Sequence, residues 1–228
     1  MANNARAARP LARLWAEWKT LLIFLLVMFV FRSAFADWYQ VPTPSMNPTI
    51  APGDRVVVNK LAYDLKFPFT TRHMARWGEP HAMPGEIVTF YSPLDERRLI
   101  KRAIRVPGDR VAMRNNQLLI NDKSLAYENV VNPTFPHLSP QTHQRHDFYV
   151  EQIGDVRHLV MILASPTQPP SPTQSPPRTG TTFGPIEVPA DHFLVLGDNR
   201  DNSADSRMIG FIARGRITGR AFSVNYDD

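Results

Sequence analysis

Ser45 lies in a proline-rich segment, residues 41–50, that follows the long apolar segment near the N-terminus. Prolines at 42, 44 and 48 fix their own φ angles at about −65° and push the residues before them toward extended conformations. We therefore expect a stiff, non-helical backbone at Ser45, which suits a nucleophile. Because a serine hydroxyl reacts only when a base removes its proton, the chain must also supply that base.

The histidines are weak candidates for this base. Asp191-His192 precedes an apolar run and could form half of a charge relay, but such a pair at the start of a strand is more often solvated turn chemistry. His143 and His146 have a spacing that suits a metal, yet their polar surroundings add no further ligand cluster. The sequence therefore assigns no metal ligand.

Lys101 is a better candidate for the base. Residues 99–106 are predicted to form a strand that ends in a Pro-Gly turn. Lys101 and Arg102 point to opposite, equally apolar faces, so alternation alone leaves open which of them is buried. Burial would lower the pKa of a lysine below about 10.4 and leave a neutral amine that accepts protons. The alternative is an exposed Lys-Arg pair at a strand edge.

Residues 197–207 form a dense polar segment, Gly-Asp-Asn-Arg-Asp-Asn-Ser-Ala-Asp-Ser-Arg. It follows Phe193–Leu196, a short apolar run typical of a buried strand. Hydrogen-bonding side chains are therefore delivered from a core strand into a loop, where they can brace a site. The alternative is an exposed turn rich in Asn and Asp.

Together these segments resemble bacterial type I signal peptidases, the membrane-bound serine proteases that remove signal peptides from exported proteins. The resemblance covers residues 15–128 and 186–222 and is weak between them. Four blocks carry it, in chain order: Ser-Met-x-Pro-Thr at 45–49, Gly-Asp followed by Val-Val-Val-Asn-Lys at 53–60, Lys-Arg leading to Pro-Gly-Asp at 101–109, and Gly-Asp-Asn-x-x-x-Ser-x-Asp-Ser-Arg at 197–207.

The resemblance implies a role for each matching residue. Ser45 is the expected nucleophile and Lys101 the general base, a Ser-Lys dyad in place of a Ser-His-Asp triad. The Thr43 hydroxyl and the backbone NH of Ser45 are expected to stabilise the oxyanion, and Ser203 to orient the lysine amine. Pro44 stands where some relatives have glycine. Support is expected from an ion pair and two residues packed beside the site: Asp205 with Arg207, and Gly197 with Asp198.

The resemblance also implies substrates and partners. Signal peptides of exported preproteins would be cut after small-x-small (A-x-A) sites, because shallow pockets reject larger side chains. The cleavage site would be presented as an extended strand just outside the bilayer. The expected reaction needs no metal, nucleotide or redox cofactor.

Composition agrees with one catalytic domain beside a membrane. The chain has 228 residues, of which 43% are hydrophobic and 21% charged, enough for one core after an anchor is subtracted. A formal net charge of +5 fits contact with anionic lipid, whereas the interleaved basic and aromatic runs typical of nucleic-acid binding are missing. With no cysteine, a disulfide framework and a thiol nucleophile are excluded.

The N-terminal segment predicts a single-pass anchor. Residues 14–36 include an uninterrupted apolar run and are long enough to cross a bilayer as a helix. The basic tail, residues 1–13, is expected in the cytoplasm by the positive-inside rule, which places the catalytic domain on the outer side of the inner membrane. A cleavable signal peptide ending at Ala36 is the alternative, although Arg32 interrupts the approach to that site.

Residues 37–228 are predicted to form an all-β catalytic domain of antiparallel sheets. Helix is expected only in the anchor and in a turn or two near residues 61–77, where Phe67, Phe69 and Trp77 could either contact lipid or be buried under a loop. A proline-rich insert at about 164–185 is expected to be disordered. Pro-Gly and Asn-Asn turns separate the expected strands, which are residues 56–59, 86–91, 99–106, 110–113, 117–120, 159–163, 193–196 and 217–224.

Two other functions remain open from the sequence. A membrane-anchored β-rich scaffold would explain the architecture but would leave Ser45 and Lys101 without a role. A peptidase that processes pilins for conjugation is harder to exclude, although the complete 197–207 block favours the general export enzyme. The oligomeric state is not predicted.

Overall fold

The chain is mainly antiparallel β-structure, as expected. The structure is a computed structural model that describes residues 15, 18–28, 36–66, 73–76, 84–105, 108–164 and 181–225. Its largest sheet has seven strands in the order β1 (Ala36–Gln40), β2 (Arg55–Asn59), β16 (Ile217–Asn225), β5 (Ile87–Tyr91), β6 (Arg98–Arg105), β14 (His192–Leu196) and β15 (Ile212–Ala213).

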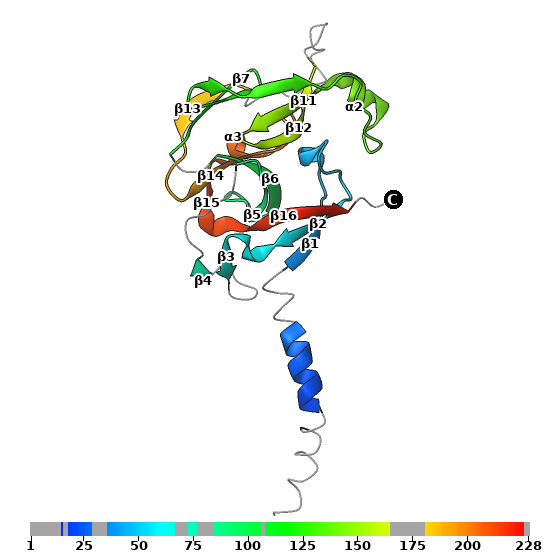
Figure 1. The fold of residues 1–228 in the computed structure, drawn as a ribbon, viewed down its shortest axis with the longest axis vertical. Coiled ribbons are helices and arrows are strands. Elements are labelled where there is room, and N and C mark those ends of the chain that lie inside the picture. Colours follow the sequence, from blue (N-terminus) through cyan, green and yellow to red (C-terminus); the bar gives the residue numbers. More distant parts are fainter. Residues whose placement is uncertain are drawn as a thin grey trace, which may run out of the picture.

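Three smaller sheets complete the fold, and Figure 1 shows β7, β11, β12 and β13 above the seven-stranded sheet in that view. The four-stranded sheet is β13 (Phe183–Glu187), β7 (Arg110–Arg114), β8 (Gln117–Ile120) and β9 (Lys123–Ser124). The others are β10 (Ala126–Asn129), β11 (His146–Ile153) and β12 (Val156–Leu163), and the pair β3 (Asp64–Lys66) and β4 (His73–Arg76). Short helices are α2 (Pro140–Arg145), α3 (Ser206–Ile209) and the 3₁₀ turns η1 (Pro44–Met46), η2 (Lys60–Ala62) and η3 (Arg214–Arg216).

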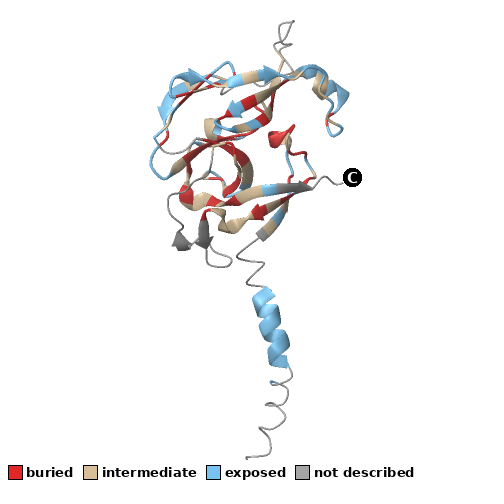
Figure 2. Cartoon of the chain, in the orientation of Figure 1, coloured by how far each residue is buried: buried red, intermediate tan, exposed pale blue. Residues whose placement is uncertain are grey.

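Strand β6 is buried on both faces, and Figure 2 shows buried residues concentrated in this part of the fold. On one face Ala103 packs with Phe90 and Phe193. On the other face Ile104 packs with Leu194 and further residues of β7 and β8. Residues 101–104 of β6 are all buried, so two polar side chains lie out of water together with the apolar ones.

Each strand expected from the sequence is present within a few residues of its predicted bounds. Of the turn or two of helix expected near residues 61–77, the described residues show the η2 turn at the start, and the chain then forms the antiparallel pair β3 and β4, with Leu65 opposite Ala75. Apolar runs this short do not distinguish helix from strand, and cross-strand pairing decides. Phe67, Phe69 and Trp77 lie outside the described residues.

The predicted disordered insert at 164–185 is too long at its C-terminal end. Strand β13 covers Phe183–Glu187 and pairs with β7, with Phe183 opposite Met113. At the other end, Ala164 donates its backbone NH to the carbonyl of Arg145 at 2.9 Å. The local sequence of β13 is a weak strand pattern, and its backbone hydrogen bonds with β7 hold it as a strand. Residues 165–180 lie outside the described part.

The predicted anchor is described in part. Residues 18–28 are helical and exposed, and β1 already begins at Ala36, where the anchor was expected to end. Within the described ranges, no helix combines the length and the hydropathy needed to cross a bilayer. The remaining residues of the 14–36 segment fall outside those ranges, apart from Trp15.

Candidate active site

Ser45 sits in a short turn rather than on the non-helical backbone expected from its prolines. The 3₁₀ turn η1 places Pro44 at its first position, and the NH of Asn47 donates to the carbonyl of Pro44 at 3.1 Å. The φ angle of proline is compatible with a first helical position, which explains the turn. Ser45 is buried, and the next residue, Met46, is fully enclosed in a core cluster with Ile50.

Lys101 of β6 reaches Ser45 from a distant part of the chain. Its Nζ atom lies 2.6 Å from Ser45 Oγ and 2.9 Å from the carbonyl oxygen of Ile100. The lysine side chain is buried, with 2% of the residue exposed. A buried amine in hydrogen-bond contact with a serine hydroxyl can take up the hydroxyl proton, which is the geometry that an activated nucleophile requires.

Burial also changes the acidity of Lys101. Removal from water lowers its pKa from 10.5 to about 8, because a charged ammonium loses its solvation. The negative charges of Asp205 and Asp198 act in the opposite direction and raise the pKa. The amine is therefore neutral in a far larger share of molecules near pH 8 than a solvated lysine would be.

Lys101 and Arg102 of β6 are both buried, an outcome that the alternation of side chains could not predict. Arg102 is 4% exposed and makes a bidentate contact with Asp198, at 2.8 and 2.6 Å, while its NH1 donates to the Gly85 carbonyl. Lys101 points to the other face and meets Ser45. The two residues therefore divide the tasks, since arginine forms the buried ion pair and lysine supplies a group that can lose its proton.

The expected support from Asp205, Arg207 and Gly197 is present as contacts. Arg207 binds Asp205 through two hydrogen bonds of 2.8 Å, and the Gly197 NH donates to the same carboxylate at 3.0 Å. A Cβ atom on Gly197 would overlap the carbonyl oxygen of Ser45 and the Ser203 hydroxyl, so glycine alone permits this close approach. Residues 197–200 and Asp205 are buried and pack against the site, whereas Asn202 and Ala204 of the same segment are exposed.

Comparison with known proteins decides the family. Residues 14–226 match the family described as "Signal peptidase, peptidase S26". The chain is 31% identical over 218 residues to a signal peptidase I of Pseudomonas fluorescens, covering 90% of this chain and 70% of that protein. The chain belongs to the signal peptidase family. It is also 31% identical over 226 residues to a signal peptidase I of Aquifex aeolicus (90% and 81% covered), and 28% identical over 219 residues to signal peptidase I T of Bacillus subtilis (95% and 88%).

Of the two further hydroxyl residues expected at the site, Thr43 contacts the Ser45 hydroxyl and Ser203 does not contact the Lys101 amine. Thr43 is an exposed residue, and its Oγ1 lies 3.3 Å from Ser45 Oγ. Ser203 Oγ is buried beside Gly197. It makes no hydrogen bond to Lys101, whose amine contacts Ser45 and the Ile100 carbonyl in the described part of the chain.

A second group of buried polar residues was missed by sequence reasoning. Arg200 contacts Glu151 at 2.6 Å, and His158 Nε2 lies 3.5 Å from the same carboxylate and 4.0 Å from Asp198. Asn199 hydrogen-bonds the segment that carries Ser45. Glu151 and His158 lie outside the four sequence blocks on which the resemblance was based. Arg200 and Asn199 lie inside the 197–207 block, whose polar density was the one signal that pointed to them.

The histidines considered as bases or metal ligands form hydrogen bonds with backbone carbonyl groups. His192 Nδ1 is 2.7 Å from the Ala190 carbonyl, His143 Nδ1 is 3.1 Å from the Ser139 carbonyl, and His146 Nδ1 is 2.8 Å from the Thr142 carbonyl. These contacts cap local turns. The group that contacts the Ser45 hydroxyl in place of a histidine is the Lys101 amine.

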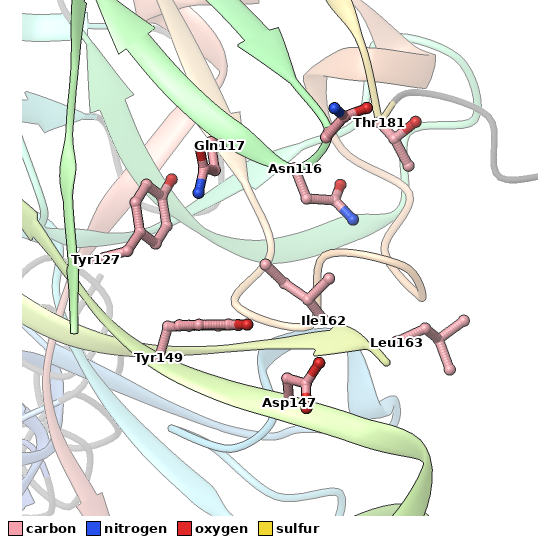
Figure 3. A pocket seen from close by; sticks show the side chains of 9 residues that line it. Asn116, Gln117, Tyr127, Asp147, Tyr149, Ile162, Leu163 and Thr181 are labelled. Carbon is pink, nitrogen blue, oxygen red and sulfur yellow. The ribbon is translucent and has the colours of Figure 1, made fainter. Parts of the chain in front are cut away.

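A polar cavity of about 460 Å³ lies elsewhere in this fold, between the β7–β8 hairpin and the sheet of β10, β11 and β12. Figure 3 shows Tyr127, Tyr149 and Asp147 around it together with the Asn116 amide. Ser45 and Lys101 do not line this cavity, which is therefore separate from the dyad. Its lining residues are Asn115, Asn116, Gln117, Tyr127, Asp147, Tyr149, Ile162, Leu163 and Thr181.

Proposed function

We propose that this chain is a membrane-bound serine endopeptidase that cleaves signal peptides from exported preproteins after small-x-small sites. Ser45 is the nucleophile and Lys101 the general base. The observation that carries the proposal is the 2.6 Å contact between Ser45 Oγ and the amine of a lysine that is 2% exposed. Membership of the signal peptidase family supplies the substrate class.

The dyad accounts for both halves of the hydrolysis. As Ser45 Oγ attacks the scissile carbonyl carbon, the neutral Lys101 amine accepts the hydroxyl proton. The resulting ammonium gives this proton to the leaving amine when the C–N bond breaks, which leaves an acyl-enzyme on Ser45. Lys101, neutral again, accepts a proton from the water that attacks the ester. When the C–O bond to Ser45 breaks, the Lys101 ammonium returns this proton to Ser45 Oγ, and the acid product leaves.

The negative charge that develops on the carbonyl oxygen is stabilised by hydrogen bonds from the Thr43 hydroxyl and the backbone NH of Ser45. The Thr43 hydroxyl lies 3.3 Å from Ser45 Oγ, so a hydrogen-bond donor stands next to the attacking atom. A donor aimed at the developing oxyanion stabilises the transition state without adding to the binding of the ground state.

Thr43 variants test this role. Thr43→Val keeps the shape but removes the donor, so kcat should fall by a factor of about 10² to 10³ with little change in KM. Thr43→Ser retains the hydroxyl and should keep most of the activity. Initial rates at several preprotein concentrations measure both parameters. Equal kcat values for Val and Thr would remove Thr43 from the oxyanion site.

The proposed membrane arrangement is a single anchor, residues 14–36, with residues 1–13 in the cytoplasm and the catalytic domain outside. The basic N-terminal tail supports this orientation. Trp38 on β1 and Phe222 on β16 are 60% and 61% exposed on the same sheet, where water-facing residues would normally be polar. Aromatic side chains at that position suit the interface between lipid headgroups and water.

Incubation of the purified full chain with a preprotein tests the proposal, with the cleavage position read by mass spectrometry. We expect one cut after an A-x-A site. Replacement of either alanine in the substrate by a large side chain should reduce kcat/KM by at least about tenfold, because a small pocket excludes it by steric overlap. Intact preprotein would support the scaffold alternative, whereas cleavage of pilin precursors alone would support the conjugation peptidase.

A further inference from the structure

Asn199 makes two hydrogen bonds to the turn that carries the nucleophile. Its side-chain Nδ2 donates to the Pro44 carbonyl at 3.1 Å, and its backbone NH donates to the Ser45 carbonyl at 3.2 Å. The residue is 3% exposed. The two carbonyl groups that flank Cα of Ser45 are therefore held from one residue. Holding these peptide groups fixes Cβ of Ser45, so Oγ keeps only the rotation about the Cα–Cβ bond, and its contact with Lys101 selects one of those positions.

Asn199 is itself held by its neighbours on the chain. The Met161 NH on β12 donates to the Asp198 carbonyl at 2.9 Å, and the Arg200 NH donates to the Met161 carbonyl at 3.0 Å. These bonds form a parallel bridge between Met161 and Asn199. The segment that contacts Ser45 is therefore hydrogen-bonded to β12 of the three-stranded sheet, whereas Lys101 lies on β6 of the seven-stranded sheet.

A buried ion pair strengthens this attachment. Arg200 is 1% exposed and contacts both oxygens of Glu151, at 2.6 and 2.7 Å, while its Nε donates to the Gly197 carbonyl at 3.2 Å. Glu151 is fully buried on β11 and also accepts the Tyr127 hydroxyl at 2.7 Å. The proposed chemistry at Ser45 uses neither charge directly.

The energetic cost of this pair indicates a role other than general stability. Taking two charges out of water costs several kcal/mol for each ion, and well-packed apolar residues often stabilise a fold equally well. A charged, multiply hydrogen-bonded pair instead imposes one geometry, since each lost contact leaves a buried charge unpaired. The geometry imposed here is that of residues 197–200, which contact Ser45.

We propose that Asn199 is a positioning residue that holds the Ser45 peptide for attack, and that the buried Glu151–Arg200 pair acts on Ser45 through Asn199. This inference rests on the proposed function of Ser45 and Lys101. The contact between Ser45 Oγ and Lys101 Nζ is 2.6 Å long, and a misplacement of about 1 Å at such a contact costs a factor on the order of 10² in rate.

Asn199→Ala tests the first part of the proposal. The variant keeps the backbone bond to Ser45 and loses the bond to Pro44, so the single-turnover rate at saturating enzyme should fall about 10- to 100-fold with KM unchanged. This rate constant does not depend on what fraction of the chain is folded, so a merely structural defect would leave it unaltered. Asn202→Ala is the matched control, because it removes an exposed amide from the same loop and should cleave at the wild-type rate.

The coupling to the ion pair is tested with Glu151→Gln, alone and combined with Asn199→Ala. Glutamine keeps an acceptor for Tyr127 but removes the charge that holds Arg200. Glu151→Gln alone should slow single turnover about tenfold. If the two residues act together, the double variant should lose less activity than the two single fold-losses multiplied together. Purely multiplicative losses would overturn the coupling. If Glu151→Gln fails to fold, the same double-variant comparison with Tyr127→Phe, which removes one hydrogen bond to Glu151, decides the coupling.

The outcomes separate this inference from the proposed function. A wild-type chain that leaves every preprotein intact would overturn the proposed function. A wild-type chain that cleaves, together with an Asn199→Ala variant of equal single-turnover rate, would overturn only the role of Asn199. All assays use the full chain in lipid vesicles or detergent. A variant is compared with the wild type only if the two have the same thermal unfolding temperature.

Discussion

Ser45→Ala and Lys101→Ala should each abolish preprotein cleavage while leaving the fold intact. Alanine at 45 removes the attacking oxygen, and alanine at 101 removes the group that accepts its proton at 2.6 Å. Loss of one member of a serine-protease unit lowers kcat by a factor on the order of 10⁶. Because the two groups act together, the double variant should be no slower than either single variant. Gel or mass-spectrometric detection of cleaved preprotein over long incubations measures the residual rate.

The stability of the two variants is the control for this result. Lys101→Ala removes an amine whose burial disfavours its charged form, so the thermal unfolding temperature should not fall as it would for a buried partner in an ion pair. Activity within a factor of about 10² of wild type in Lys101→Ala would contradict the dyad. The base would then have to be sought among the histidines.

Lys101→Arg should be equally inactive, and the wild-type pH profile gives the reason. The Lys101 pKa is lowered to about 8, and only the neutral amine accepts a proton. Activity should therefore rise as the pH rises through about 8, and it should be lost below that value as the amine becomes charged. Arginine stays protonated at any working pH, so Lys101→Arg keeps a positive charge at the site but offers no base.

The pH dependence of kcat/KM measures this group in the free enzyme. Single His→Ala variants are the control, since they should leave the midpoint of the profile in place. A rise centred at about 6.5, the value of an ordinary histidine, that disappears in one of these variants would contradict Lys101 as the base. A midpoint at about 10.4 would instead contradict its burial.

Local sequence patterns were sufficient for five of the seven strands in the sheet that carries Lys101, but they missed β1 and β15. Runs such as 193–196 and 217–224 are apolar, bounded by turn residues, and appear as β14 and β16. These patterns predict structure because strand alternation and turn chemistry are properties of a few neighbouring residues. The same reasoning also missed β3, β4, β10, β11 and β13, which depend on pairing with another segment.

For the site, the sequence by itself determined which residue types were present and in which order. The types and the spacing of the residues were enough to name Ser45, Lys101 and the block from Gly197 to Arg207 as candidates. Their family membership follows from the same residues. A chain order of motifs is sufficient for this because the chemistry requires a hydroxyl, an amine and polar support, whatever distance separates them along the chain.

Only the tertiary structure decided how these groups meet. Alternation left Lys101 and Arg102 equivalent, and they differ because Asp198 lies on one face of β6 while Ser45 lies on the other. The Glu151–Arg200 pair was likewise not predictable, since it joins β11 to the loop after β14. Burial and charge pairing depend on which segments pack together, and the resulting desolvation is what lowers the pKa of Lys101 and makes an ordinary lysine a candidate base.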